Sequence, residues 1–121
     1  MFKSIAFVHY STHNLDRALK FYRDALGLEL LLQTEEWVEF KMGDQRLALR
    51  RIDASQPLTP AQPTGAMIWL KACPIETTVT YLKSININFI KGLTEFSYGK
   101  TSIIADPDGN AIGLYEPPAE E

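Results

Sequence analysis

The sequence predicts an α+β protein built from two βαβββ modules, because the chain runs through the same order of elements twice. Residues 7–22 (FVHYSTHNLDRALKFY) align at a constant offset with residues 67–82 (MIWLKACPIETTVTYL), and both read as a strand, a break and a helix. Residues 47–50 (LALR) match residues 112–115 (IGLY), and each run follows a turn that contains Asp and Gly. The repeat fixes the architecture to which each candidate residue is assigned.

The first module begins with residues 3–10, which alternate in polarity and are rich in β-formers, as a strand requires. Asn14 is a candidate helix N-cap, and from Leu15 apolar residues recur at helical spacing until Gly27 supplies the stop. Three short strand-like runs then follow, the last two joined by the tight turn Gly43-Asp44, at residues 28–33, 37–42 and 46–51.

Residues 53–64 (DASQPLTPAQPT) contain three prolines among small polar residues, which predicts a linker. The modules are therefore residues 1–52 and 65–117 of a single domain that spans 1–121. The second module repeats the first, with a helix that starts near Pro74. Its strands are expected at residues 66–71, from residue 88, and at 98–105 and 110–116, the last two flanking a cluster of turn formers.

Composition excludes several functional classes. A chain of 121 residues with 45% hydrophobic and 22% charged residues fits one globular domain. The net charge is −3 and no stripe of Lys and Arg with interleaved aromatics occurs, so we expect no nucleic-acid partner. The N-terminal residues are too few and too polar for a signal peptide or membrane span, and Cys73 is the only cysteine. The sequence thus predicts a cytoplasmic protein without a membrane partner.

Two runs, LDRALKFYRDALGLEL (15–30) and ADPDGNAIGLYEP (105–117), resemble the vicinal oxygen chelate superfamily. This superfamily includes glyoxalase I, extradiol dioxygenases, fosfomycin-inactivating enzymes and bleomycin-binding resistance proteins. The resemblance covers nearly the whole chain, and its most specific pieces are the Leu-x-x-Ala-x-x-Phe-Tyr helix and the turn at 106–110. It implies a cup-shaped mixed sheet with helices outside, and a homodimer.

In the metal-dependent members of this superfamily, ligands come from the first and last strands of each module. The positions that match here are Phe7, Ala48, Met67 and Gly113. Phenylalanine, alanine and glycine offer no donor, and a methionine thioether suits only soft metals. The resemblance to the metal-free branch therefore predicts no metal and no cofactor. A third reading keeps a metal through the shifted donors His9 and Glu39.

Strand parity extends this set, because side chains two residues apart face the same way. The predicted ligand-binding residues are Phe7, His9, Ala48, Arg50, Met67, Trp69, Gly113 and Tyr115. Mostly apolar walls with a few polar groups are typical of a site for a flat or amphipathic small molecule. Arg50 is either a rim charge or a clamp for a carboxylate or phosphate. Met67 and Trp69 either contact the ligand or fill the core.

Two functions remain open, and the sequence does not decide whether the protein is an enzyme. The first is a metal-independent binding protein that sequesters a planar or amphipathic, and in one version anionic, organic compound, as resistance proteins do. The second is a glyoxalase-like lyase or isomerase without the usual metal. In that reading His9 is the general base, and Arg50 or Tyr115 stabilises the developing oxyanion.

Overall fold

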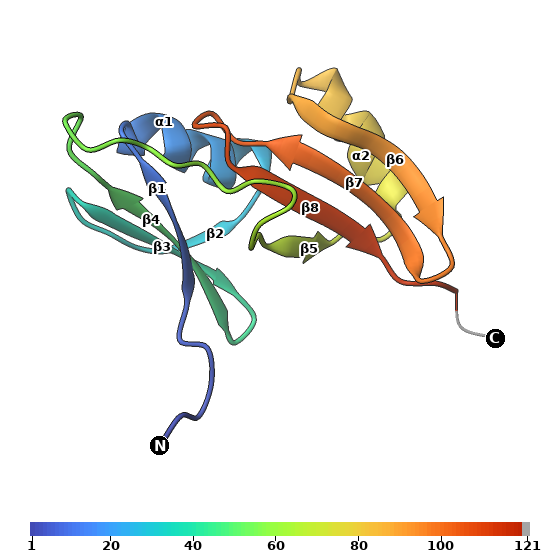
Figure 1. Ribbon diagram of the computed structural model, residues 1–121, viewed down its shortest axis with the longest axis horizontal. Coiled ribbons are helices and arrows are strands. Elements are labelled where there is room, and N and C mark those ends of the chain that lie inside the picture. Colours follow the sequence, from blue (N-terminus) through green and yellow to red (C-terminus); the bar gives the residue numbers. More distant parts are fainter. Residues whose placement is uncertain (120–121) are drawn as a thin grey trace. The chain divides into compact units, whose positions relative to one another are not determined.

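Each half of the chain forms a four-stranded sheet with one helical segment against it (Figure 1). The computed structural model describes residues 1–119. Its two units are Met1–Pro60 and Ala61–Glu121. In both units a strand, a helix and three strands follow one another along the chain. The predicted α+β class with two βαβββ modules is confirmed.

The first unit has a sheet of order β1-β4-β3-β2, in which β1 runs parallel to β4 and the other pairs are antiparallel. Its elements are β1 (Val8–Thr12), α1 (Leu15–Lys20), a π-helical turn η1 (Phe21–Ala25), β2 (Glu29–Gln33), β3 (Trp37–Met42) and β4 (Gln45–Arg51). Asn14 caps α1, since its side-chain oxygen accepts the Arg17 N–H at 3.0 Å. Gly27 ends the helical segment with a φ of +74°.

The prediction of a strand at residues 3–10 was wrong at both ends. The β1 ladder runs from Val8 opposite Leu47 to Thr12 opposite Arg51, so the extent of β4 sets the extent of β1. Residues before Val8 find no partner strand within the described chain and project as an extended N-terminal segment (Figure 1).

One face of the first sheet packs against the helix. Tyr22 is fully buried there, with its ring centroid 6.5 Å from that of Tyr10 on β1 and 6.0 Å from that of Phe40 on β3. Burying a large apolar side chain stabilises a fold by about 1.5–3 kcal/mol, so this cluster contributes to the stability of the unit. Because side chains alternate along a strand, the neighbouring residues must point to the opposite face.

The second unit has a sheet of order β5-β8-β7-β6, with β5 parallel to β8 and the other pairs antiparallel. Its elements are β5 (Trp69–Lys71), α2 (Ile75–Ser84), β6 (Phe89–Phe96), β7 (Gly99–Ala105) and β8 (Ala111–Glu116). The strand expected at 66–71 is shorter than predicted, because its ladder with β8 begins only at Trp69.

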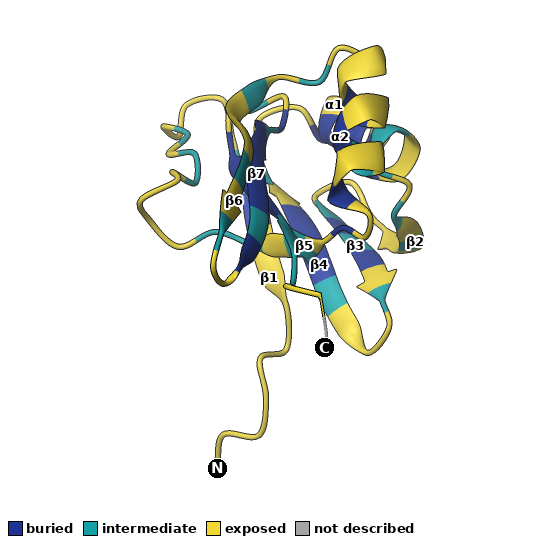
Figure 2. Ribbon diagram, turned by 90° about the vertical axis from the view of Figure 1, so that its right-hand side faces the viewer, coloured by how far each residue is buried: buried dark blue, intermediate teal, exposed yellow. Residues whose placement is uncertain are grey.

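The helix of the second unit is held on β7 and β8 by an apolar stripe and a polar clamp. Ile75, Val79 and Leu82 are buried at helical spacing, and Figure 2 shows the inner strands darkest. At its start, the Ile75 N–H donates to a Glu116 carboxylate oxygen at 3.0 Å, and Lys100 bridges Glu116 to the first turn of α2. None of the helices within residues 1–119 is long and apolar enough to cross a bilayer.

The turn between β7 and β8 is stabilised by its own side chains. One oxygen of the Asp106 carboxylate accepts the backbone N–H groups of Asp108 and Asn110, both at 2.9 Å. The other oxygen accepts a hydrogen bond from the side-chain amide of Asn110. The Asn110 side-chain oxygen accepts the Ala61 N–H at 2.8 Å, and the Ala111 N–H donates back to the Ala61 carbonyl. The side chains of Asp106 and Asn110 therefore have a structural role in this turn.

Candidate functional site

The first unit brings half of the predicted site together on the sheet face opposite α1. The strand register places His9 on β1 beside Ala48 on β4, and Ala48 beside Glu39 on β3. One step along, Arg50 lies opposite Trp37. The four predicted residues of this unit, Phe7, His9, Ala48 and Arg50, thus share a face with two further residues, Trp37 and Glu39.

Three aromatic rings meet on this face. The Trp37 centroid lies 5.2 Å from that of Phe7, edge to face at 80°, and 6.0 Å from that of His9. Neighbouring strands are about 4.8 Å apart, so rings from β3 and β1 can meet only above the intervening β4. Ala48 is the small residue at that point, and it is completely buried although it lies on the face away from the helix. We infer that the rings cover it.

The indole of Trp37 is oriented by a hydrogen bond. Its Nε1–H donates to Glu39 Oε2 at 2.8 Å, and both residues are half-buried. Side chains two apart on one strand face the same way, so β3 supplies the ring and the carboxylate that holds it. Neither residue was in the predicted ligand-binding set. A signal existed, because counting outward from the turn Gly43-Asp44 pairs Trp37 with Arg50.

In the second unit the predicted residues surround Gly113. Trp69 on β5 is the direct register partner of Gly113, and Tyr115 follows two residues later on β8 with Lys71 as its partner. The six-membered ring of Trp69 lies so close to the Gly113 backbone that a Cβ there would collide with it. The indole nevertheless remains 49% exposed, and Met67 is half-buried just before β5. Trp69 is therefore a platform that rests on glycine.

Tyr115 has a defined partner within its own unit. Its hydroxyl donates to the Tyr98 carbonyl oxygen at 2.7 Å. Its aromatic carbons also crowd the space beside Gly99, whose φ is +135°. Since a phenol has one proton to donate, stabilising an oxyanion with Tyr115 would require this hydrogen bond to break.

The donor set at the four positions matched to metal ligands does not fit a divalent cation. The side chains of Phe7, Ala48 and Gly113 carry no donor atom, and the Trp69 ring lies against Gly113. Within residues 1–119, no group of three or more His, Cys, Asp and Glu side chains is placed to hold a metal ion. His9 and Glu39 were the alternative metal ligands, and the Glu39 carboxylate accepts a hydrogen bond from the Trp37 indole N–H.

The two βαβββ units, each with an aromatic platform on the sheet face away from its helix, define a glyoxalase-like α+β protein. Residues 4–114 match the family model described as the Glyoxalase/Bleomycin resistance protein/Dioxygenase superfamily, and the chain belongs to this family.

Relatives in this family have different activities. The chain is 27% identical to the metallothiol transferase FosB of Staphylococcus saprophyticus over 117 residues, which covers 95% of this chain and 78% of that protein. A glyoxalase family protein from Enterococcus faecalis is 25% identical, with a TM-score of 0.78 over 95% of this chain and 98% of that one. TnmS3, an antibiotic-binding protein from Streptomyces sp. CB03234, has the same fold, with 21% identity and a TM-score of 0.79 over 97% and 98%.

Proposed function

We propose that this protein binds a planar or amphipathic small organic molecule without a metal ion, in the manner of the family's antibiotic-binding members. The observation that carries the proposal is that both last-strand positions, Ala48 and Gly113, hold small residues: the Trp69 ring lies against Gly113, and Ala48 is completely buried beneath a face that carries the Trp37 ring. A metal centre needs side-chain donors at such positions, whereas a binding site for a flat compound needs exposed ring faces. This arrangement supports a binding platform rather than a metal centre.

Under this proposal the chain differs from its relative, the metallothiol transferase FosB, in working without a metal ion. Restoring a donor at position 113 would require a side chain where the Trp69 ring now lies. Restoring one at position 48 would require displacing the rings of Phe7, His9 and Trp37. Both changes would remove the aromatic surface that we propose as the binding platform.

A thermal-shift screen of planar and amphipathic compounds tests this function. A ligand at one hundred times its Kd stabilises the native state by about 2.7 kcal/mol, which shifts the melting temperature measurably. We expect hits whose shift persists in EDTA and weakens in Trp37→Leu and Trp69→Leu, but not in Tyr81→Leu, which alters an exposed ring on α2. Shifts that require added manganese, nickel, zinc or iron would refute metal independence.

A second function is favoured by the position of His9. Its imidazole is exposed on the same face as Arg50 and Glu39, next to the Trp37 ring, where it could take a proton from a bound compound. This is the lyase or isomerase reading. His9→Ala separates the two functions, because turnover must disappear under the second whereas binding alone weakens modestly under the first.

We also propose that the protein is a cytoplasmic homodimer. Phe2 and Ile5 lie almost fully exposed on the N-terminal segment, and a dimer interface that includes this segment would bury them. Light scattering at several concentrations tests the dimer, and deletion of residues 1–6 should weaken it if this segment contributes. A monomer at every concentration would exclude the dimer.

A further inference from the structure

A pocket of about 640 Å³ opens in the first unit where β1 and β4 end. Its volume lies in the range of small-molecule sites. The lining combines one large ring with charged and polar groups, namely His13, Glu36, Trp37, Arg50, Arg51, Ile52, Asp53, Ala54 and Gln56. Trp37 and Arg50 belong both to this pocket and to the aromatic face described above.

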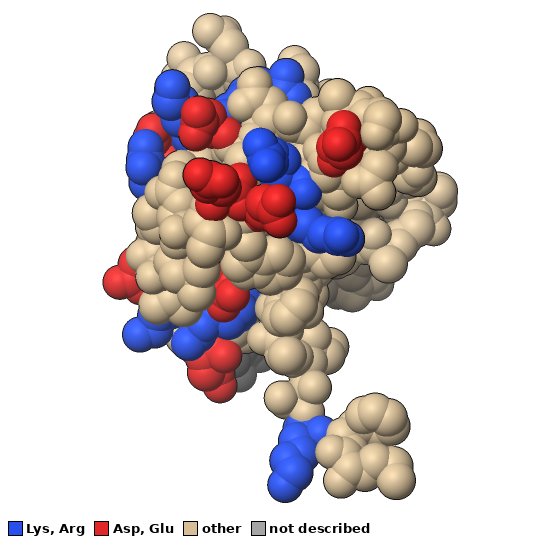
Figure 3. Space-filling view, turned by 90° about the vertical axis from the view of Figure 1, so that its left-hand side faces the viewer, with Lys and Arg blue, Asp and Glu red and all other residues tan. Residues whose placement is uncertain are grey.

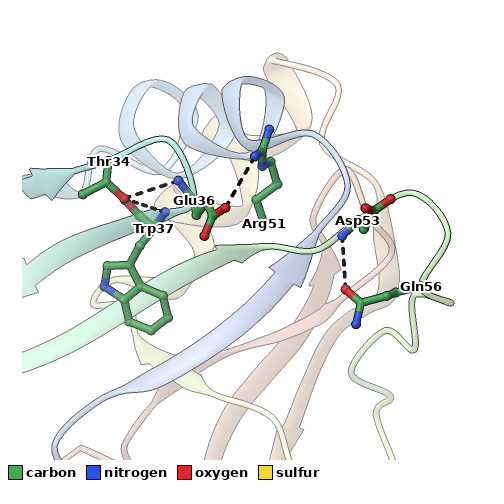
Figure 4. A network of polar contacts seen from close by, with 6 residues as sticks. All are labelled: Thr34, Glu36, Trp37, Arg51, Asp53 and Gln56. Carbon is green, nitrogen blue, oxygen red and sulfur yellow. Dashed lines mark hydrogen bonds and ion pairs between the residues drawn. The ribbon is translucent and has the colours of Figure 1, made fainter.

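The wall of the pocket is built by hydrogen bonds. His13 Nε2 donates to the Gln56 carbonyl at 2.8 Å, which joins the loop after β1 to the loop after β4. The Gln56 side chain accepts the Asp53 N–H at 3.2 Å, and Figure 4 shows this contact at one side of the network. At the other side, Thr34 Oγ1 accepts the Trp37 N–H at 3.0 Å. These hydrogen bonds hold together the loops that line the pocket.

Among the charged side chains that line the pocket, Arg50 is the one available to bind an anion. Arg51 lies 3.9 Å from the Glu36 carboxylate. Asp53 accepts the Ser55 N–H at 3.1 Å, and this hydrogen bond lowers the pKa of the Asp53 carboxyl. The side chain of Arg50 is exposed and makes no hydrogen bond or ion pair with any residue between 1 and 119. Acidic and basic side chains are intermixed on the face shown in Figure 3 rather than gathered by sign.

The aromatic residue and the cationic residue of the pocket lie next to each other. Trp37 and Arg50 are direct cross-strand partners, so their Cβ atoms are about 4.5–5.5 Å apart on one face. That separation matches a compound whose ring rests on the indole while an attached oxyanion reaches the guanidinium. A guanidinium fork binds a planar carboxylate through two parallel hydrogen bonds. The carboxylates of Glu36 and Asp53 line the same pocket and repel a doubly charged group more than a singly charged one.

We propose that this pocket binds an aromatic carboxylate, with Trp37 holding the ring and Arg50 holding the carboxylate. The inference rests on the proposed binding function and names the class of compound. Trp37 is a specificity-determining residue in this scheme, and Glu39 is the positioning residue that fixes its indole through the 2.8 Å hydrogen bond.

The test uses three naphthalene probes that share one ring system: 1-naphthoate, neutral 1-naphthalenemethanol and dianionic 1-naphthyl phosphate. Affinities are measured by calorimetry on the full chain. The chain has two tryptophans, so the two indole N–H signals in an NMR spectrum report where the ring binds. The variant is Arg50→Gln, and its matched control is Arg46→Gln on the same face of β4, whose guanidinium donates to backbone carbonyls near the turn.

We expect 1-naphthoate to bind at least about 10-fold more tightly than the alcohol and the phosphate, and to shift the Trp37 indole signal. Arg50→Gln should weaken naphthoate binding about 10- to 100-fold, as expected for loss of a hydrogen bond to a charged group, and leave the alcohol unaffected. Arg46→Gln should have less than about a 3-fold effect. An unchanged melting temperature verifies the fold, and Arg50→Lys, which keeps the charge but not the fork, should fall between wild type and Arg50→Gln.

Equal affinity for naphthoate and the alcohol would overturn the carboxylate inference and leave the binding function intact. Tighter binding of the phosphate would replace carboxylate by phosphate and also overturn it. Naphthoate binding that shifts only the Trp69 signal would overturn the pocket assignment. Failure of all three probes would overturn the inference, whereas the proposed function itself fails only if the wider compound screen finds no metal-independent ligand.

Discussion

Each sheet carries an indole ring on the face away from its helix, but the two rings are positioned in different ways. In the first unit the small residue is Ala48, and the ring above it comes from β3 and is held by a hydrogen bond to Glu39. In the second unit the small residue is Gly113, and the ring comes from its direct partner Trp69 and rests on the backbone itself. One indole is positioned by polar chemistry and the other by the absence of a side chain.

This difference implies a division of roles. The first face carries an imidazole, a guanidinium and a carboxylate beside its ring, whereas the second offers a flat exposed indole with Met67 nearby and the Tyr115 hydroxyl already engaged. We therefore expect changes in the first unit to alter which compounds bind, and changes in the second to alter how well any flat compound binds.

The largest effect is expected from Gly113→Ala. The new Cβ must displace the Trp69 ring, and overpacking of this kind costs about 1–3 kcal/mol in the free energy of unfolding. Chemical denaturation measures it. Gly92→Ala on β6 is the matched control, because a Cβ there meets open space. If collision is the cause, Gly113→Ala should cost little in a Trp69→Ala background; an equal cost in both backgrounds would contradict the platform.

A smaller effect is expected from removing the carboxylate that orients Trp37. Glu39→Leu should lower the free energy of unfolding by about 0.5–1.5 kcal/mol, the usual net value of one hydrogen bond, and change the Trp37 indole signal. Glu39→Gln keeps an acceptor oxygen and should retain most of the orientation. If both variants leave the indole signal where it is in the wild type, Glu39 does not position the ring.

Deleting the Tyr115 hydroxyl should cost still less. Tyr115→Phe removes a hydrogen bond that lies near the surface, so we expect a loss of about 0.5 kcal/mol in the free energy of unfolding. Tyr98→Phe is the control, because the acceptor is the Tyr98 main-chain carbonyl and not its hydroxyl. Were Tyr115→Phe instead to abolish a catalytic activity, Tyr115 would have the oxyanion role and our division of roles between the faces would fail.

A still smaller effect is expected at the polar clamp that holds α2 in the second unit, and this effect depends on pH. The hydrogen bond from Lys100 lowers the pKa of the Glu76 carboxyl below its ordinary value of about 4.5. A lowered folded-state pKa stabilises the fold above that ordinary value, and the stabilisation is lost as pH falls through the lower one. Melting temperatures of wild type and Glu76→Gln should therefore differ slightly at pH 7 and converge as the pH falls through the lowered pKa.

Asp24→Asn is the counterpart in the first unit. There the Arg23 side-chain hydrogen bond lowers the pKa of the Asp24 carboxyl, but the two residues are neighbours in one helical turn and tie no helix to the sheet. Its effect on the melting temperature should be smaller than that of Glu76→Gln at the same pH. The reverse order would show that the Lys100 clamp does not hold α2.

Much of the fold could be predicted because local rules act on short segments. The Asn14 cap, the Gly27 stop and the first hairpin all follow from neighbours in sequence. The start of β1 could not be predicted, because residues 3–7 have strand character but no partner strand within residues 1–119, and pairing is decided by β4 about forty residues away.

The site was predictable only where register could be counted. Trp37 follows from the hairpin turn, since both strands extend outward from Gly43-Asp44 one residue at a time. The contact between Trp69 and Gly113 does not follow, because β5 and β8 are parallel and no tight turn joins them. The alternation of side chains placed these two residues on one face. Their direct contact depends on the register of β5 against β8, which only the three-dimensional structure provides.

The Asn110 contact has a practical consequence for cutting the chain. The Ala61 N–H donates to the Asn110 side-chain oxygen, and the Ala61 carbonyl accepts the N–H of Ala111, the first residue of β8. Farther along β8, the Gly113 N–H donates to the Ile68 carbonyl. The stretch between Ala61 and Ile68 is therefore a loop that is hydrogen-bonded to the second sheet at each end. A fragment meant to reproduce the second unit must therefore start upstream of Ala61, whereas one begun at the first residue of β5 would discard a native anchor.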